Sequence, residues 1–423
     1  MKKITPVLLA KMKFEKMKSY FILIGFIIFN FGFSNKNKSQ EISFLFMGDI
    51  MGHGPQIRAA WQDSAQKYDY DEVFNPLKEL ISSVDFAVAN LEVTLAGAPY
   101  DGYPQFSSPD NLAESCKNNG VDVLVTANNH SCDRTNKGVI RTVKKLDQLS
   151  ILHTGTFANN KLRDSLNLLI LKKKGISVGL LNYTYGTNGM PFFSPAYVNI
   201  LDSAIIKKDI ISAKDKAIDK LIVFVHWGSE YQDFPNNFQK NYNSYFQSLG
   251  VDVVIGSHPH VLQPMIYHSD SADRKEFLTV YSLGNFVSNQ RERRKDGGAM
   301  FRLSFKKISD QVLISNKEYL LTWVHKYKIN NKNHYQILPC TQKKYDKSYF
   351  ENESHYNKMK IFINDSRKHL NTNNIGINEG DPYPILNIEP LPPQPISIDQ
   401  NKIKVKKLKG KKKRFNFFKR NKK

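Results

Sequence analysis

Cysteine is scarce in this chain of 423 residues, which contains only Cys116, Cys132 and Cys340. Three irregularly spaced thiols exclude a disulfide framework and a structural zinc site built on paired cysteines. An odd number leaves at least one thiol free. No cysteine lies within residues 1–40, around the amino-terminal apolar segment, which excludes a lipid anchor on that side chain. The cysteine content by itself says little about the compartment.

A long hydrophobic run is also missing. The longest apolar stretch at the amino terminus, residues 20–33, is shorter than the roughly 20 residues that a membrane-spanning helix needs. It follows a basic segment, residues 1–19, and this order is typical of a secretory signal. No Ala-x-Ala cleavage site follows. A cleaved signal peptide and an uncleaved anchor over residues 1–40 are therefore both open, and a buried core helix is a third alternative. We expect an exported body in the cell envelope, membrane-anchored, periplasmic or extracellular.

Acidic residues are absent from residues 402–423, which contain thirteen lysines and arginines. This segment holds more than half of the net charge of +22, so the rest of the chain is only mildly basic. The tail is either a solvated segment or a contact for an anionic surface, such as lipid headgroups or an anionic envelope polymer. Nucleic acid is not expected as a partner, because the amino-terminal segment predicts export.

Composition divides the chain into five segments. Six prolines between residues 381 and 396 rule out regular structure and predict an extended linker. The segments are a signal peptide or anchor (1–40), a main domain (41–340), a polar helical extension (341–380), the Pro-rich linker (381–400) and the polybasic tail (401–423).

Six short apolar runs share one arrangement, because each ends abruptly in a cluster of polar residues. The runs lack clean polar alternation, which is typical of strands covered on both faces. They lie at residues 42–47, 84–89, 121–126, 221–225, 251–255 and 279–283.

Amphipathic segments at residues 111–118, 138–149 and 238–249 predict helices between these strands. Strands that alternate with helices predict an α/β fold with a largely parallel sheet. Alternating patterns after Gly298 predict a β-rich carboxyl-terminal part of the same domain. Ligands of such sheets bind beyond the carboxyl ends of the strands, where the polar clusters lie.

The polar clusters contain imidazole, carboxylate and amide groups but no thiolate, and this set suits divalent metals such as Mn²⁺ or Zn²⁺. The residues are Asp49, Glu92, Asn129, His130, His226, His258 and His260. Each has an ordinary alternative: a cap or turn residue, a loop histidine or a core imidazole. Their shared position at strand ends predicts one common site.

The stretch Gly256-Ser-His-Pro-His presents two imidazoles from one loop. Pro259 fixes its own φ angle and is expected to push Ser257 and His258 toward an extended backbone. A stiff loop of this kind would lose little entropy on binding a metal.

The motifs GDIM, ANLE, ANNHSCD, HWGSEY, GSHPHVLQ and YSLGNF resemble, in order and spacing, those of the bacterial capsule-synthesis CapA family, which includes a poly-gamma-glutamate synthesis component. That family is related to calcineurin-like metallophosphoesterases. The resemblance covers residues 42 to about 288. It implies a metallophosphoesterase-like β sandwich flanked by helices, with one or two divalent metals above the strand ends.

The resemblance also implies a role for each matching residue. The expected metal ligands are Asp49, Glu92, Asn129, His226, His258 and His260. His130 is the expected general acid. Residues expected to orient ligands or line the pocket are His53, Asp133, Glu230 and Asn285, with Tyr231 and Trp227 as further pocket residues; ordinary turn, surface and packing roles are the alternatives for these.

Three positions depart from the phosphoesterase pattern. Met51 stands where the first motif has a histidine, and the nearest imidazole is His53. Glu92 replaces an aspartate and adds one methylene. A glycine is expected near Thr135 or Asn136, and Asn136 is a residue that tolerates a left-handed backbone. These departures leave open whether the centre holds one metal, two or none.

Two functions follow as hypotheses. The first is a metal-dependent hydrolase of a phosphoester or related bond in capsule or envelope-polymer metabolism. The second is a non-catalytic component of capsule synthesis or export that binds the anionic polymer or its precursor without turnover. Met51 favours the second hypothesis and the three histidines His226, His258 and His260 favour the first.

Overall fold

The computed structural model describes residues 40–270, 275–341 and 345–381. Almost all of the predicted signal or anchor segment, the Pro-rich linker and the polybasic tail lie outside these residues. Among the described residues, no helix is both long enough and apolar enough to cross a membrane.

The first sheet has the strand order β18-β17-β16-β1-β4-β5-β6, with β15 beside β1 and β19 beside β17. Strands β1, β4, β5 and β6 are parallel, and β16, β17 and β18 extend the sheet in antiparallel fashion. The strands are β1 (Glu41–Ile50), β4 (Phe86–Leu91), β5 (Val123–Val125), β6 (Leu152–Thr154), β15 (Asn285–Val287), β16 (Gly297–Ile308), β17 (Gln311–Ile329), β18 (Lys332–Pro339) and β19 (Asn378–Glu379).

The second sheet has the order β13-β14-β12-β11-β9-β8. Its four central strands are parallel, while β13 and β8 are antiparallel edges. The strands are β8 (Leu169–Lys173), β9 (Ile176–Thr184), β11 (Lys220–His226), β12 (Val253–Ser257), β13 (Leu262–Asp270) and β14 (Lys275–Leu283). Four further short strands form two pairs: β2 (Trp61–Gln62) with β3 (Lys67–Tyr68), and β7 (Thr156–Phe157) with β10 (Tyr197–Val198).

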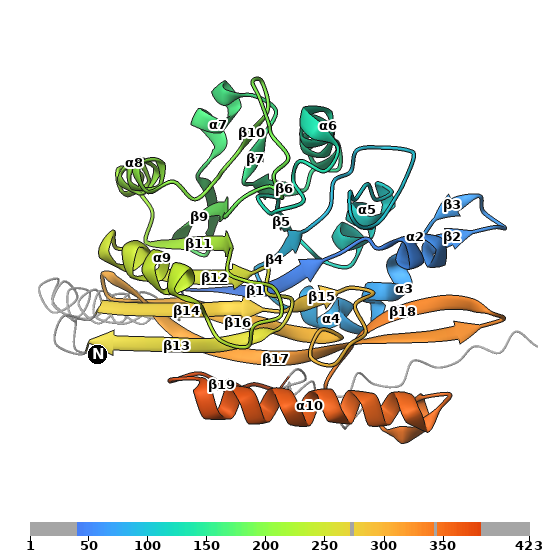
Figure 1. Cartoon of the computed structure of the whole chain (residues 1–423). Coiled ribbons are helices and arrows are strands. Elements are labelled where there is room, and N and C mark those ends of the chain that lie inside the picture. Colours follow the sequence, from blue (N-terminus) through green and yellow to red (C-terminus); the bar gives the residue numbers. More distant parts are fainter. Residues whose placement is uncertain (1–39, 271–274, 342–344, 382–423) are drawn as a thin grey trace, which may run out of the picture. The chain divides into compact units, whose positions relative to one another are not determined.

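Most helices cover the outer faces of the two sheets, and the last helix lies against β13 and β17 (Figure 1). The helices are α2 (Gly54–Ala60), α3 (Asp71–Phe74), α4 (Lys78–Ile81), α5 (Asn111–Asn118), α6 (Thr135–Gln148), α7 (Asn160–Leu166), α8 (Ser203–Lys214), α9 (Asn237–Ser248) and α10 (Glu353–Asn373), with 3-10 turns at Asn75–Leu77 and Lys347–Tyr349.

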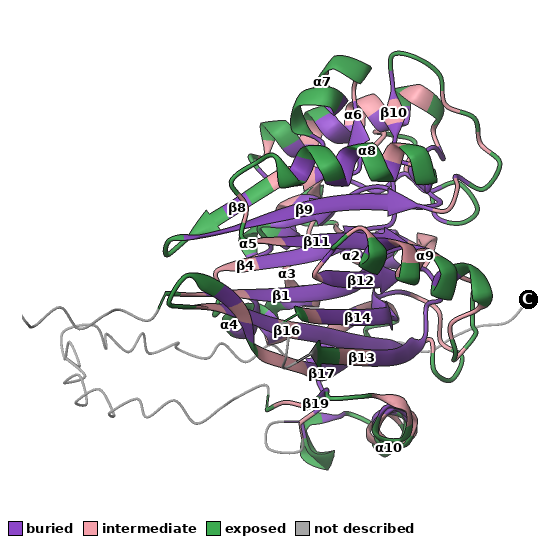
Figure 2. Cartoon of the chain, turned by 90° about the vertical axis from the view of Figure 1, so that its left-hand side faces the viewer, coloured by how far each residue is buried: buried purple, intermediate pink, exposed green. Residues whose placement is uncertain are grey.

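The central core lies between the two sheets and explains the uninterrupted apolar runs. Phe44 and Phe46 of β1 pack with residues of the second sheet such as Phe224. Leu45 and Met47 point the other way, toward the core beneath the helices. Because successive strand residues face opposite sides, a strand covered on both faces needs apolar residues at every position. Figure 2 shows both sheets as buried and the helices around them as largely exposed or intermediate.

The six strands predicted from apolar runs are confirmed, as are the three helices and the α/β class. The β-rich carboxyl-terminal part is also confirmed, and it joins the first sheet directly through β1 and β16. Strand β17 contains two polar residues, Asn316 and Lys317, that interrupt its apolar pattern. In the structure it is continuous, because both residues pair with β16.

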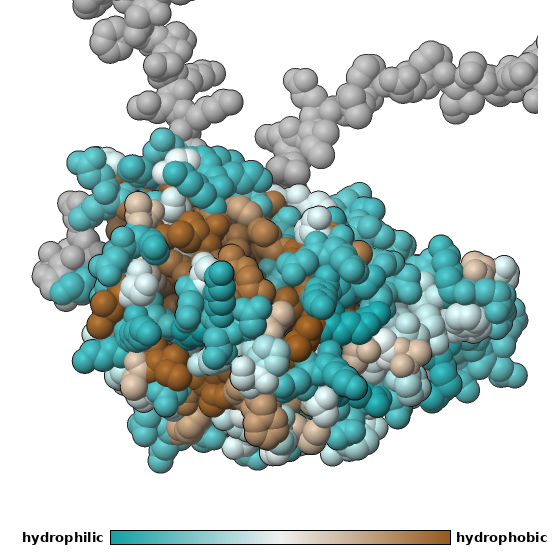
Figure 3. All heavy atoms as spheres, turned by 90° about the horizontal axis from the view of Figure 1, so that it is seen from above, coloured by the Kyte–Doolittle hydropathy of each residue, from teal (hydrophilic) through white to brown (hydrophobic). Residues whose placement is uncertain are grey.

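Helix α10 packs on the sheets through Met359, Phe362 and Ile363, which belong to the central core. Figure 3 shows the face formed by the outer helices, with apolar patches between hydrophilic residues. Exposed apolar side chains on this part of the chain include Leu166 on α7 and Ile211 on α8.

Candidate metal centre

Strand ends from both sheets meet at the candidate site. Glu92 directly follows β4 of the first sheet, His226 is the last residue of β11, and His258 directly follows β12 of the second sheet. Asp49 lies in β1, where a register shift interrupts the ladder with β4. All four side chains are buried. The sequence-predicted convergence of these residues is therefore present in the fold.

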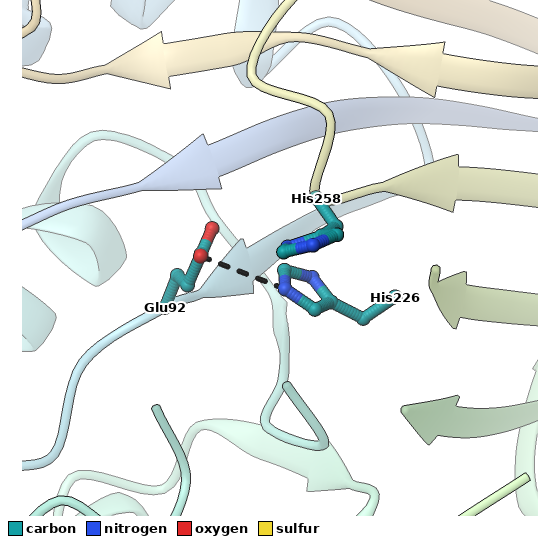
Figure 4. A group of neighbouring side chains, drawn as sticks. All are labelled: Glu92, His226 and His258. Carbon is teal, nitrogen blue, oxygen red and sulfur yellow. Dashed lines mark ion pairs between the residues drawn. The ribbon is translucent and has the colours of Figure 1, made fainter. Parts of the chain in front are cut away.

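Glu92 is shared by two groups of possible metal ligands. One group joins Glu92 to His226 and His258, and the other joins it to Asp49 and His260. In each group the ligand atoms lie within 4.8 Å of one another. Glu92 Oε1 lies 3.5 Å from His226 Nε2 and 3.7 Å from His260 Nε2. Figure 4 shows the Glu92 carboxylate pointing toward the His226 ring, with the His258 ring beside it.

Asn129 extends the first of these groups. Its Oδ1 lies 2.8 Å from Nε2 of His226, the same nitrogen that faces Glu92. The Nδ2 of Asn129 donates to Asn188 Oδ1 at 3.3 Å, which fixes the amide with its oxygen toward the site. The structure thus brings the other five expected ligands together around the Glu92 carboxylate.

The Glu92 carboxylate has no hydrogen-bond partner on either oxygen, although both oxygens are buried. A buried, unpartnered carboxylate is costly unless a cation or donor meets it. Burial, together with the charge of Asp49, raises the pKa of Glu92 well above its usual value. Nδ1 of His258 is likewise buried without a partner. Imidazole nitrogens and carboxylate oxygens aimed at a common point fit a divalent cation of the Mn²⁺ or Zn²⁺ class.

Asp49 is held in place by Asn90 of β4 and by two residues of the His-Pro-His loop. Its Oδ1 accepts from Asn90 Nδ2 at 2.8 Å, and its Oδ2 lies 3.2 Å from His260 Nδ1. The backbone N–H of His258 points at Oδ2 from 3.3 Å. Burial alone would raise the pKa of Asp49, but the hydrogen bond and charge of His260 outweigh it and lower the pKa. Asp49 is therefore ionised, which is the form that binds a metal.

His226 and His258 are held neutral by their surroundings. Burial, aided by the neighbouring His258, lowers the pKa of His226 well below its usual value. Burial and the nearby His260 lower the pKa of His258 to about 3. Neutral imidazole is the ligand form of histidine.

Asn90 and Ser257 are site residues that the sequence reasoning missed. Asn90 Nδ2 lies 2.8 Å from Asp49 Oδ1 and 3.2 Å from His226 Nδ1, so it links the two sheets. Ser257 Oγ lies 2.9 Å from the same His226 nitrogen. These contacts orient His226 so that Nε2 faces Glu92. The signal was present in the ANLE and GSHPH motifs, where both residues precede a ligand.

His130 is fixed by Asp133. Its Nδ1 lies 2.7 Å from Asp133 Oδ2, which also accepts the backbone N–H of Phe106 at 2.7 Å. The ring of Phe106 packs edge-on against the imidazole at 4.6 Å between centroids. An ionised Asp133 only accepts hydrogen bonds, so Nδ1 carries the proton and Nε2 is the nitrogen that can exchange one.

The His-Pro-His loop does not have the expected backbone. His258 has a φ of 98° and His260 a φ of 57°, so the prediction of an extended His258 is wrong. Tertiary contacts override the preference imposed by Pro259: the His258 N–H faces Asp49, and the Tyr231 N–H donates to the Pro259 carbonyl at 2.8 Å. Left-handed non-glycine residues of this kind concentrate at functional sites.

Four residues were expected to orient ligands or line the pocket. Three of them, Glu230, Asn285 and Asp133, lie next to residues of the candidate site. Glu230 is exposed and forms a ligand-capable group with His258 and His260. Asn285 Oδ1 lies 3.1 Å from His260 Nδ1. Asp133 holds His130, as described above.

His53 caps helix α2, and its Nδ1 lies 3.1 Å from Gln56 Oε1. Among the described residues, none of the ligand-capable groups includes His53. Met51 is buried in the core beneath the helices. The first motif thus contributes Asp49 and no imidazole to the ligand groups.

Two aromatic residues named as pocket candidates also differ in role. Trp227 is fully buried, with its indole N–H donating to the Tyr281 carbonyl at 2.9 Å, so it is a core residue. Tyr231 is partly exposed near His260, with ring centroids 6.0 Å apart.

At the turn after His130 the left-handed residue is Thr135, with a φ of 58°. The side chain of Asn136 instead forms hydrogen bonds with the backbone carbonyl and N–H of Phe193.

The sequence matches the family described as "Bacterial capsule synthesis protein PGA_cap" over residues 43–290, which is more than half of the chain. The matched range contains all six expected ligands and His130. The chain therefore belongs to this family of bacterial capsule synthesis proteins.

Two curated proteins are similar in sequence. The "Capsule biosynthesis protein CapA" of Bacillus anthracis is 25% identical over 274 residues, covering 62% of this chain and 64% of that protein. The "PGA biosynthesis protein CapA" of Bacillus subtilis (strain 168) is 27% identical over 283 residues, covering 64% of this chain and 70% of that protein. The match thus spans about two thirds of the length of either relative.

Among solved structures, a calcineurin-like phosphoesterase YfkN from Bacillus subtilis aligns at 12% identity and a TM-score of 0.39, covering 78% of this chain and 98% of that chain. A 5'-nucleotidase from Candida albicans SC5314 aligns at 12% identity and a TM-score of 0.37, covering 78% of this chain and 58% of that chain. Sequence identity and structural similarity this low give no information about the activity of this protein.

Proposed function

We propose that this protein is a metal-dependent hydrolase of a phosphoester or related bond that acts in capsule or envelope-polymer metabolism. The observation that carries the proposal is the Glu92 carboxylate, buried without a hydrogen-bond partner between two sets of ligand-capable side chains. A purely structural site would give such a group a hydrogen-bond partner.

The ligand roles follow from the two groups around Glu92. Asp49 and His260 would hold one cation with Glu92, and His226, His258 and Asn129 would hold a second with the same carboxylate. Divalent cations bound there would polarise a substrate oxygen and lower the pKa of a water molecule toward neutrality. Manganese or zinc suits this mixture of nitrogen and oxygen ligands.

His130 would act as the general acid of the reaction. The Asp133 carboxylate fixes the imidazole and keeps one proton on Nδ1, so the imidazolium form would give its second proton, on Nε2, to a leaving group and become neutral. Phe106 shields one edge of the ring, so that the imidazole is presented in one orientation.

The place of action is proposed to be the cell envelope. The names of both relatives refer to capsule or PGA biosynthesis, and the amino-terminal residues predict export. An anionic envelope polymer or its precursor is the proposed partner, with the membrane contacted through the amino terminus and the basic tail. No role in nucleic-acid binding is proposed.

The direct test is metal content and activity. We expect protein purified without chelator to contain manganese or zinc, and the metal-loaded protein to hydrolyse a generic phosphoester such as bis-p-nitrophenyl phosphate. A Glu92→Gln variant should lose both properties. A wild-type protein that binds neither metal and shows no turnover with either added would overturn the proposal.

A second candidate is a non-catalytic component that binds the polymer during synthesis or export. The observation in its favour is the first motif, where Met51 replaces an imidazole and His53 caps a helix instead of joining a ligand group. Capsule formation in cells that carry His258→Ala separates the two functions. Capsule that persists favours the binding role, whereas its loss with normal protein levels favours catalysis.

A further inference from the structure

A second group of ligand-capable side chains lies outside the family-matched residues 43–290. It consists of His325 on β17, Glu351 just before α10 and His355 in the first turn of α10. Each offers one ligand atom, and these atoms lie within 4.8 Å of one another. None of these residues takes part in the site around Glu92.

The spacing of the three atoms suits a single bound ion. His325 Nε2 lies 3.2 Å from His355 Nδ1, and Glu351 Oε2 lies 3.7 Å and 3.4 Å from these nitrogens in turn. Ligands held about 2.0–2.2 Å from a tetrahedral zinc ion are themselves separated by roughly 3.3–3.6 Å. The three side chains therefore already have nearly the separations that a zinc ion requires.

The His325 ring is fixed in the orientation that the ion needs. It stacks on Tyr327 with ring centroids 4.7 Å apart and meets the edge of Phe350 at 5.0 Å. Its residue is 2% exposed, and its Nδ1 is buried without a hydrogen-bond partner. All polar contacts of this imidazole therefore go through Nε2, which faces His355 and Glu351. Little side-chain entropy remains to be lost on binding.

A hydrogen bond between the two imidazoles explains only part of this arrangement. One N–H can join His325 Nε2 to His355 Nδ1, which are 3.2 Å apart. The Glu351 carboxylate then faces two nitrogens that share a single proton, although its side chain is 48% exposed and could turn toward water. A cation at the centre satisfies all three atoms at once.

We propose that His325, Glu351 and His355 form a second metal site for a divalent cation of the zinc class. Two imidazoles and one carboxylate are an established zinc ligand set, and they leave one coordination position for water. Glu351 and His355 also line an open hollow of about 470 Å³, which gives an ion a route in from solvent. The bound ion would tie the start of α10 to β17.

The test uses the full chain with the Glu92 centre disabled by Glu92→Gln and His260→Ala, which together remove a ligand from every group at that centre, stripped of metal and titrated with zinc by calorimetry. We expect binding of about one equivalent and a rise in the melting temperature. Adding Glu351→Gln or His355→Ala should weaken zinc binding by at least about ten-fold and abolish the thermal shift. His268→Ala, which removes an exposed histidine on β13, is the matched control and should change neither quantity.

If the background variant does not fold, the stoichiometry of the otherwise wild-type chain decides. Glu351→Gln should then contain about one zinc ion fewer than wild type, with unchanged phosphoester hydrolysis. Equal zinc content and equal zinc-dependent stabilisation in wild type, Glu351→Gln and His355→Ala would overturn the proposal. If only the Glu92 centre lost its metal, the difference in zinc content between wild type and Glu351→Gln would remain. The two sites are therefore tested separately.

Discussion

His226 Nε2 lies 3.5 Å from Glu92 Oε1, although the two residues end strands of different sheets. The site is therefore a contact between the sheets, and it depends on how they pack. Asn90 strengthens this contact, because its amide reaches both Asp49 in its own sheet and His226 in the other. A bound cation at Glu92 would thus hold the two sheets together as well as support chemistry.

Glu92→Gln should reverse the order of stability between the metal-free and metal-loaded states. At neutral pH and without metal, the variant should be more stable than wild type by about 1 kcal/mol or more, because burial opposes the carboxylate charge and glutamine carries none. With zinc or manganese added, wild type should gain stability and the variant should not. Thermal unfolding with and without chelator measures both; wild type more stable in each state would contradict the account.

His130→Ala should lower kcat for phosphoester hydrolysis by about 10²–10⁴-fold without loss of metal. Asp133→Asn should lower kcat by a smaller factor, because the imidazole remains but loses its anionic partner. The matched control is Asp147→Asn, which breaks a similar bond of 3.0 Å to His153 at the surface. Steady-state kinetics and metal analysis separate the effects, and equal kcat values for Asp133→Asn and Asp147→Asn would count against the assigned role.

Acidification should destabilise the metal-free protein partly through His53. Burial, with a smaller effect of His260, lowers the pKa of His53 from 6.5 to about 4. Between these values the unfolded chain binds a proton that the folded chain does not, so the stability present above pH 6.5 is lost as pH falls toward 4. The slope contributed by this group is at most about 1.4 kcal/mol per pH unit.

His53→Asn should flatten that slope, since asparagine can still cap α2 and does not titrate. Urea unfolding in the presence of chelator, repeated across this pH range, measures the difference. The same variant should keep its metal content, because His53 belongs to none of the ligand groups among the described residues. A pH profile that matches wild type would show that His53 is not a buried neutral imidazole.

Gly48→Ala should destabilise the fold and weaken metal binding together. A β-carbon at position 48 would lie 2.0 Å from the Gly284 carbonyl oxygen, which accepts the Asp49 N–H at 3.1 Å. The strands must separate to fit it, at a cost of about 1–3 kcal/mol. Gly186→Ala, where nothing lies within 4 Å, should change stability by less than about 0.5 kcal/mol. Chemical denaturation compares the two variants, and equal effects would show that close approach at Gly48 is unimportant.

The parts of the fold that follow from local pattern could be predicted from the sequence. Apolar runs covered on both faces predict strands, so β1, β11 and β12 were found, as was α5 with its apolar stripe. The strand β9 was missed even though every one of its residues is buried. Its pattern does not distinguish a strand from a helix without knowledge of its neighbours β8 and β11.

The composition of the site could be predicted, but not its supporting contacts. Carboxylate and imidazole residues at strand ends are visible in the sequence. The link from Asn90 to His226 is not, because it depends on how the two sheets pack. The backbone conformation of His258 was also predicted wrongly, because the contact between its N–H and the Asp49 carboxylate overrides the local effect of Pro259. The ligand roles themselves stay predictions until metal is measured.

The most direct test of the central claim is anomalous diffraction at the manganese or zinc edge from crystals of the full chain loaded with that metal. We expect a peak about 2.0–2.3 Å from a Glu92 carboxylate oxygen and from nitrogens of His226 and His258, or of His260 beside Asp49. Crystals that contain the metal but show no anomalous peak within bonding distance of Glu92 would contradict it.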